Sequence, residues 1–178
     1  MSFLANPFTR PSRAGDAWFC AGPASSYPNL DDSARVGEQR PCQGTFTAGC
    51  RVFHVPRDDS SKAVQVAIDD WKDAKSGDAK DQVMVFQYAG KFIAINHECP
   101  HSSFPLSAGT AFDIEDFGVK LSSAITCPQH DWSFDLHTGK ADRGSYKLQV
   151  WEVQQRPAAA GARHGDTDIW VRRKQRIG

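Results

Sequence analysis

Hydrophobic and polar residues alternate in short runs along much of the chain, as they do in half-buried β-strands. The clearest example is residues 82–96, QVMVFQYAGKFIAIN, in which two β-rich runs flank Ala89-Gly90-Lys91 and predict a hairpin. Further strands are predicted at 50–56, 121–126, 132–135, 146–153 and 168–173, with a short one in DAWFCAG. Short strands separated by turn signals predict an all-β sandwich or small barrel.

Two stretches are less regular. In residues 61–75, SKAVQVAIDDWKDAK, the apolar positions fit both a strand and a helical face, and we expect a strand followed by a helical turn. Residues 1–49 are rich in proline, glycine and serine and predict an irregular extension with at most one edge strand. Residues 50–178 are then the folded domain.

Composition narrows the class of protein. The 178 residues are 40% hydrophobic, and 21 basic residues balance 21 acidic ones, so charge gives no reason to expect nucleic acid or a membrane as partner. No apolar run approaches the roughly 18 residues that span a bilayer. The N-terminal stretch lacks the apolar run of a secretory signal, so we expect a cytoplasmic protein, with the mitochondrial matrix as the alternative.

The cysteines are odd in number. Five cysteines without a secretory signal argue against a disulfide framework, so Cys20, Cys42 and Cys50 are expected to be core or surface thiols.

The candidate chemistry lies in two loops, near 97–107 and 126–139. The first contains Cys99-Pro100-His101 and the second Cys127-Pro128-Gln129-His130. Two thiolates and two imidazoles that converge from two loops suit either zinc or an iron–sulfur cluster.

The two motifs, C-P-H followed by C-P-x-H-x-W-x-F-D-x-x-T-G, resemble the Rieske [2Fe–2S] domain family, and the similarity extends from 82 to 153. The resemblance implies a Rieske-type antiparallel β-sandwich with a small cluster-binding subdomain of two ligand loops. It implies that Cys99 and Cys127 hold one iron while His101 and His130 hold the other. A structural Cys2His2 zinc site is the alternative, although zinc fingers usually pair like ligands within a loop.

Other residues near the loops are given different roles. His97 and His137 are expected to lie at the surface or beside the ligands without binding metal. The segment DRGSYK, residues 142–147, is expected to form a third loop that covers the cluster.

The resemblance also bears on redox potential. High-potential members carry an extra cysteine in each loop and hydroxyl donors after the second histidine, whereas this chain has Phe104 and Gln129, then Trp132 and Phe134, at those positions. Hydrogen bonds to sulfur help set the potential. We therefore expect a low-potential cluster.

An insertion separates the two loops. Residues 108–123 place three acidic residues among two phenylalanines: Asp113, Glu115 and Asp116 beside Phe112 and Phe117. We expect a surface flap that packs its phenylalanines, and the alternative is an element that docks a partner or shields the cluster.

The sequence predicts an electron carrier and not an enzyme. Outside the cluster loops only His54 and His164 remain, too few for the mononuclear iron site of a Rieske oxygenase, and no G-x-G-x-x-G motif is present. The expected partners are an NAD(P)H-dependent reductase and a terminal oxygenase or other oxidoreductase. The alternative is a tightly bound subunit of a multicomponent oxygenase or nitrite-reductase-like enzyme.

Overall fold

The structure, a computed structural model, describes residues 14–30, 42, 49–67, 79–158 and 165–174. Strands dominate these residues: β1 Phe19–Pro23, β2 Cys50–His54, β3 Val64–Val66, β4 Gln82–Tyr88, β5 Lys91–Asn96, β6 Thr110–Asp116, β7 Val119–Cys127, β8 Trp132–Asp135, β9 Glu152–Pro157 and β10 Thr167–Arg172. Four single 3-10 turns accompany them: η1 Ala14–Asp16, η2 Ala24–Ser26, η3 Ser60–Lys62 and η4 Leu106–Ala108. Within the described ranges, no helix has the length and hydrophobicity needed to cross a membrane.

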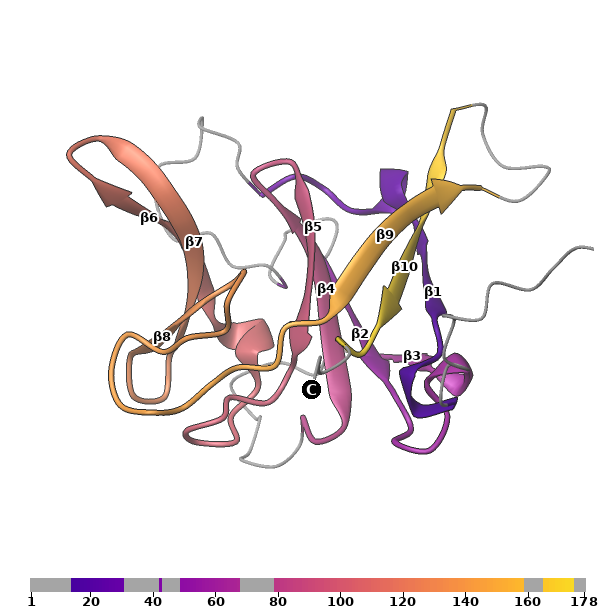
Figure 1. Ribbon diagram of the computed structural model, residues 1–178, viewed down its shortest axis with the longest axis horizontal. Helices are drawn as coiled ribbons and strands as arrows, with labels where there is room; N and C mark the ends of the chain where they lie inside the picture. The colour runs from indigo at the N-terminus through magenta and orange to yellow at the C-terminus, as the bar shows by residue number, and fades with distance from the viewer. Residues whose placement is uncertain (1–13, 31–41, 43–48, 68–78, 159–164, 175–178) are drawn as a thin grey trace, which may run out of the picture.

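The strands form three antiparallel sheets. Their orders are β1-β10-β9, β3-β2-β4-β5 and β6-β7-β8. Figure 1 shows the sheet that contains β4 and β5 between the other two. The all-β antiparallel fold expected from the sequence is confirmed.

Strand β4 of the middle sheet is buried on both faces, which explains its continuous apolar run. Val83 and Val85 point into a core shared with β1 and β10, while Met84 and Phe86 point into a second core shared with β7 and β8. Alternate residues of a strand face opposite sides, so a strand covered twice needs apolar residues at every position. Each such side chain contributes about 1.5–3 kcal/mol by burial.

Most predicted strands are present. The hairpin over 82–96 is confirmed, with Ala89 and Gly90 at φ 49° and 73° in its turn. Strands β7, β8 and β10 match the predictions for 121–126, 132–135 and 168–173. In the segment 61–75 the strand is confirmed as β3, and the helical turn expected after it falls largely on residues outside the described ranges.

The prediction of a strand over 146–153 was wrong for residues 146–151, because β9 begins at Glu152. The preceding residues bond to two different elements: the Leu148 N–H donates to the Gly139 carbonyl and the Trp151 N–H to the Ala94 carbonyl. Backbone that changes partner within a few residues cannot form one continuous ladder.

The insertion forms strand β6, a two-residue turn at Phe117-Gly118 and the start of β7. The expectation of a flap that packs its phenylalanines was wrong. Phe117 is fully exposed at 100%, and Phe112 is 38% exposed on the edge strand of its sheet.

The expectation of unpaired thiols was wrong for two cysteines. Cys42 and Cys50 form a disulfide, with Cα atoms 4.8 Å apart. Cys50 is the first residue of β2. Cys20 is a free, exposed thiol.

Described residues between positions 14 and 30 pack on the sheets. β1 pairs with β10, and Phe19 and Ala21 belong to the core between these strands and the middle sheet. Arg173, just after β10, reaches across to this segment: its guanidinium donates to the Gly15 carbonyl at 2.7 Å and to the Ser60 hydroxyl at 2.7 Å. The boundary at residue 50 remains a prediction.

Candidate metal centre

The first loop leaves β5 and folds into a tight turn around Cys99. The Ser103 N–H donates to the Cys99 carbonyl at 2.8 Å, and the Cys99 N–H donates to the Phe104 carbonyl at 2.9 Å. Ser103 adopts a positive φ of 54°, which lets the chain reverse within five residues. Pro100 inside the turn fixes one φ angle and so stiffens the position of His101.

The second loop repeats this geometry between β7 and β8. The Asp131 N–H donates to the Cys127 carbonyl at 3.0 Å, and Asp131 has a φ of 57°. In both loops the residue four positions after the cysteine closes the turn. The sequence echo C-P-H and C-P-Q-H therefore corresponds to two turns of the same kind, each of which presents one cysteine and one histidine.

The two turns bring Cys99 and Cys127 together. Both cysteines are buried, and the thiol of Cys127 hydrogen-bonds to the sulfur of Cys99. This bond is the main cause that lowers the pKa of Cys99, and the same contact raises the pKa of Cys127. The backbone N–H groups of Ser102 and His101 add hydrogen bonds to the Cys99 sulfur.

The two histidines also lie side by side. The ring centroids of His101 and His130 are 5.1 Å apart, with the planes at 78°. His130 is exposed, whereas His101 is only partly exposed. The Nδ1 atom of His101 is buried and has no hydrogen-bond partner among the described residues. Burying a polar nitrogen without a partner is costly, and a metal ion would remove that cost.

The third loop, residues 142–147, lies against the His101 ring. His101 stacks on Trp132 with centroids 4.3 Å apart and planes at 15°, and the Tyr146 ring meets His101 edge-on at 5.3 Å. Arg143 lies over the Trp132 ring and donates to the Asp131 carbonyl at 3.1 Å. The segment DRGSYK therefore lies beside the two motifs, and its covering of the cluster stays a prediction.

Sequence reasoning missed one polar contact. The Ser102 hydroxyl lies 3.7 Å from the Cys127 sulfur and can donate to it. Trp132 and Phe134 carry no hydroxyl, as expected, but a serine in the first loop reaches a sulfur. The only signal was its place directly after His101.

The other two histidines stay apart from the pair. His97 is buried, so the surface position is wrong for it, and its Nδ1 lies 2.8 Å from the Gln82 side-chain oxygen. Burial lowers its pKa to about 4, which keeps the ring neutral. His137 is exposed, and its backbone N–H donates to Asp135.

The donors form a sulfur pair and a nitrogen pair. Among the described residues, no group of three or more histidine, cysteine or acidic side chains is arranged to hold a single ion. A tetrahedral zinc needs its four donors within about 2.0–2.3 Å of one point. Two separate pairs, one of them with an unpartnered nitrogen, fit a cofactor that has two metal ions of different ligation.

The fold and these paired donors define a β-domain with a candidate binuclear metal centre. The model of the Rieske [2Fe-2S] domain family matches residues 50–154, more than half of the chain. The chain belongs to this family. Its cofactor is therefore a [2Fe–2S] cluster, and its general role is electron transfer.

Curated relatives match over shorter stretches. A Rieske domain-containing protein of Homo sapiens is 37% identical over 59 residues, which are 33% of this chain and 34% of that protein. The ferredoxin subunit of 3-phenylpropionate/cinnamic acid dioxygenase from Escherichia coli (strain K12) is 36% identical over 64 residues, 36% of this chain and 53% of the subunit. The matches thus span about a third to a half of the relatives' lengths.

Two solved structures are also similar. A chain assigned as the small subunit of an NADH-dependent nitrite reductase from Mycobacterium tuberculosis has a TM-score of 0.49 and 14% identity, over 90% of this chain and 98% of that one. A chain from the complex of reduced oxygenase and oxidized ferredoxin in carbazole 1,9a-dioxygenase has a TM-score of 0.38 and 23% identity, over 57% of this chain and 80% of that one.

Proposed function

We propose that Cys99 and Cys127 bind one iron of the cluster and that His101 and His130 bind the other. The observation that carries this assignment is the buried Nδ1 of His101, which has no partner in the described residues and lies beside a second imidazole. The paired sulfurs supply the other half of the donor set. When bound, the cluster accepts and releases one electron at a time.

The imidazoles of His101 and His130 differ in their surroundings and therefore in their roles. Trp132 and Tyr146 cover His101 and fix its orientation, while His130 is exposed and faces the solvent. His130 is therefore the contact through which electrons pass to or from a partner. The chain itself needs no substrate pocket for this role, so it acts as an electron-transfer component and not as the catalyst.

The partners belong to the same proposal. An NAD(P)H-dependent reductase supplies single electrons, and a terminal oxygenase or other oxidoreductase in the cytoplasm accepts them. The curated ferredoxin subunit named above supports this class of partner. The potential lies near the lower end of the family range of about −150 to +300 mV, because Trp132 and Phe134 carry no hydroxyl. Protein-film voltammetry that gives a value above about +100 mV would contradict this part.

The ligand assignment is tested by histidine replacement. His101→Ala and His130→Ala should each abolish the visible absorption of the cluster and the binding of two irons and two sulfides per chain. His137→Ala is the matched control, because His137 lies in the same loop region without joining the pair, and it should retain both. A chain that keeps the cluster after either ligand replacement would refute the assignment, and zinc in place of iron would support the structural zinc alternative.

A tightly bound subunit is the second candidate. The feature that favours it is the projecting β6–β7 hairpin, whose exposed Phe117 is suited to a lasting contact. Size-exclusion chromatography of the tagged protein at its native level separates the two. A diffusible carrier elutes near the mass of the single chain, whereas a bound subunit coelutes with an oxidoreductase.

A further inference from the structure

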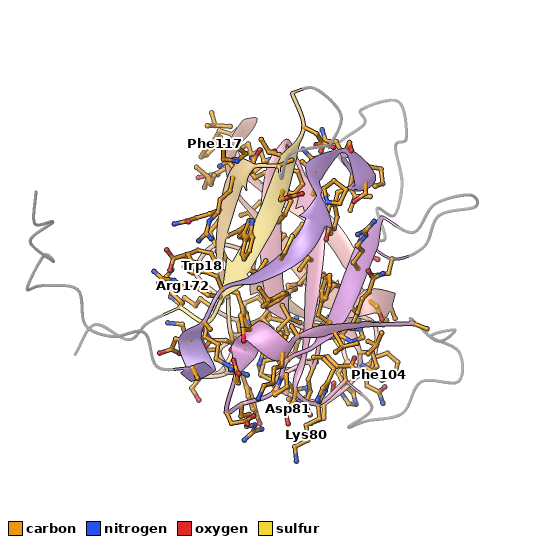
Figure 2. All side chains as sticks on the ribbon, turned by 90° about the vertical axis from the view of Figure 1, so that its right-hand side faces the viewer. Trp18, Lys80, Asp81, Phe104, Phe117 and Arg172 are labelled. Atoms are coloured by element: carbon orange, nitrogen blue, oxygen red, sulfur yellow. A yellow bond between two sulfur atoms is a disulfide. The ribbon has the colours of Figure 1, made fainter. Side chains whose placement is uncertain are left out.

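The β6–β7 hairpin projects from the rest of the molecule with its apolar side chains uncovered. Figure 1 shows it extending away from the middle sheet, and Phe117 is labelled at its far end in Figure 2. Phe117 is 100% exposed, and Val119 and Leu121 on the following strand are 60% and 64% exposed. Isolated exposed apolar residues are ordinary, but three within five positions on a projecting hairpin form a patch.

The backbone at the tip adds a second, independent observation. Phe117 and Gly118 have φ angles of 47° and 75°, the pair of left-handed residues that a two-residue hairpin turn requires. Asparagine or aspartate is favoured at the first of these positions, and a bulky residue there is a steric outlier. Phe117 is thus unfavourable for the turn and gains nothing from burial. Unfavourable local choices of this kind concentrate at functional sites.

The charges beside the patch indicate what covers it. The Lys120 ammonium lies 2.7 Å from the Asp113 carboxylate and neutralises its charge. No ion pair of Glu115 or Asp116 is found in the described part of the chain. Two copies meeting tip to tip would bring four uncompensated carboxylates together, and an anionic lipid surface would be repelled in the same way. A protein surface with an apolar pocket rimmed by lysine or arginine complements both features.

We propose that Phe117 is the anchor of a docking site, formed with Val119 and Leu121, for a partner protein that presents an apolar pocket with a basic rim. Buried aromatic anchors supply much of the affinity of protein interfaces. Strand β7 runs from Val119, beside the hairpin tip, to Cys127 at its other end, a distance of about 27 Å along the strand. The docking site is therefore separate from the exposed His130, and it stands whether or not the ligand assignment is correct.

The first step of the test is site-specific photocrosslinking. The full chain carries p-benzoylphenylalanine at position 117 in the cells that make it, and the control carries it at position 64, because Val64 is 63% exposed on a different edge strand. The proposal predicts one dominant crosslinked protein from position 117 that is absent from position 64. That protein is then purified and its affinity for the cluster-loaded chain is measured.

The second step uses Phe117→Asn, which removes the anchor but suits the turn. The variant should keep or raise the melting temperature while the dissociation constant rises about tenfold or more. Val64→Asn should change the dissociation constant by less than about twofold. The dissociation constant of the unmodified chain should also rise with salt concentration, as expected for contacts between Asp116 and a basic rim.

Several outcomes would overturn the proposal. These are equal crosslinking from positions 117 and 64, a crosslink to a second copy of this chain, and an affinity that Phe117→Asn leaves unchanged. Flotation with vesicles of phosphatidylcholine and phosphatidylserine that is lost in Phe117→Asn would assign the patch to a lipid surface instead. The visible spectrum of each variant reports the cluster separately, so a failed docking test cannot be mistaken for a failed metal site.

Discussion

Replacing Ser102 with alanine should lower the reduction potential of the cluster. The Ser102 hydroxyl lies 3.7 Å from the Cys127 sulfur in a partly buried position. Reduction adds negative charge to the ligand set, so a donated hydrogen bond stabilises the reduced form more than the oxidised one. Hydrogen bonds contribute about 0.5–1.5 kcal/mol between neutral groups and about 1.5–3 kcal/mol to charged ones, so the difference between the two redox states is about 1 kcal/mol. For a one-electron couple this corresponds to a decrease of about 40 mV.

Protein-film voltammetry on the purified, cluster-loaded variants measures this shift directly. Ser102→Thr retains a hydroxyl and should stay close to the unmodified protein. Ser103→Ala is the neighbouring control, because the Ser103 backbone bonds the Cys99 carbonyl and no side-chain bond from Ser103 to either sulfur is found in the described residues. A Ser102→Ala potential within about 10 mV of the unmodified protein, or above it, would refute the reasoning.

Three further substitutions test the scaffold by thermal and chemical unfolding. Arg173→Ala should cost about 3 kcal/mol of unfolding free energy, because the guanidinium donates hydrogen bonds to Gly15 and Ser60 across the fold. Arg173→Lys should cost less. Equal stability of the unmodified chain and both variants would contradict this. Burial alone would raise the pKa of the Asp135 carboxyl. Hydrogen bonds from Ser122 and Thr138 nevertheless hold this pKa below its usual range. The unmodified chain should therefore exceed Asp135→Asn in stability at neutral pH and lose that advantage as the pH falls through the native pKa. An advantage that stays undiminished as the solution is made acidic would argue against it. Gly139→Ala should prevent normal folding of the third loop, because Gly139 has a φ of 73° and an added Cβ would collide with the Leu148 carbonyl. Gly90→Ala is the control and should cost far less stability, because an added Cβ there meets open space.

The strands and the two ligand loops were predictable because their signals are local. Each signal lies within a few residues: the apolar and β-rich runs of β4 and β5, the Ala89-Gly90 turn, and the repeated motif of cysteine, proline and histidine. The all-β fold follows from such patterns, whereas the pairing of Cys99 with Cys127 was implied by the family resemblance of the two motifs. The third loop was predictable from its position after the second motif.

The features that were missed depend on contacts between distant segments. The disulfide joins Cys42 to Cys50 across a segment that periodicity does not describe, and no spacing rule indicated it. The residues before Glu152 looked like a strand, but their backbone changes partner from Gly139 to Ala94. The exposure of Phe117 was unpredictable because an apolar residue in an insertion is usually assumed to pack. The side-chain contact from Ser102 to a sulfur likewise depends on how one loop lies on the other.

Pulsed electron paramagnetic resonance of the dithionite-reduced protein, with histidine nitrogens labelled by ¹⁵N, tests the mixed ligation of the cluster most directly. The account predicts two strongly coupled histidine nitrogens, with couplings that disappear together with the signal in His101→Ala or His130→Ala and persist in His137→Ala. A reduced cluster without nitrogen couplings, or a silent sample that contains zinc, would contradict it.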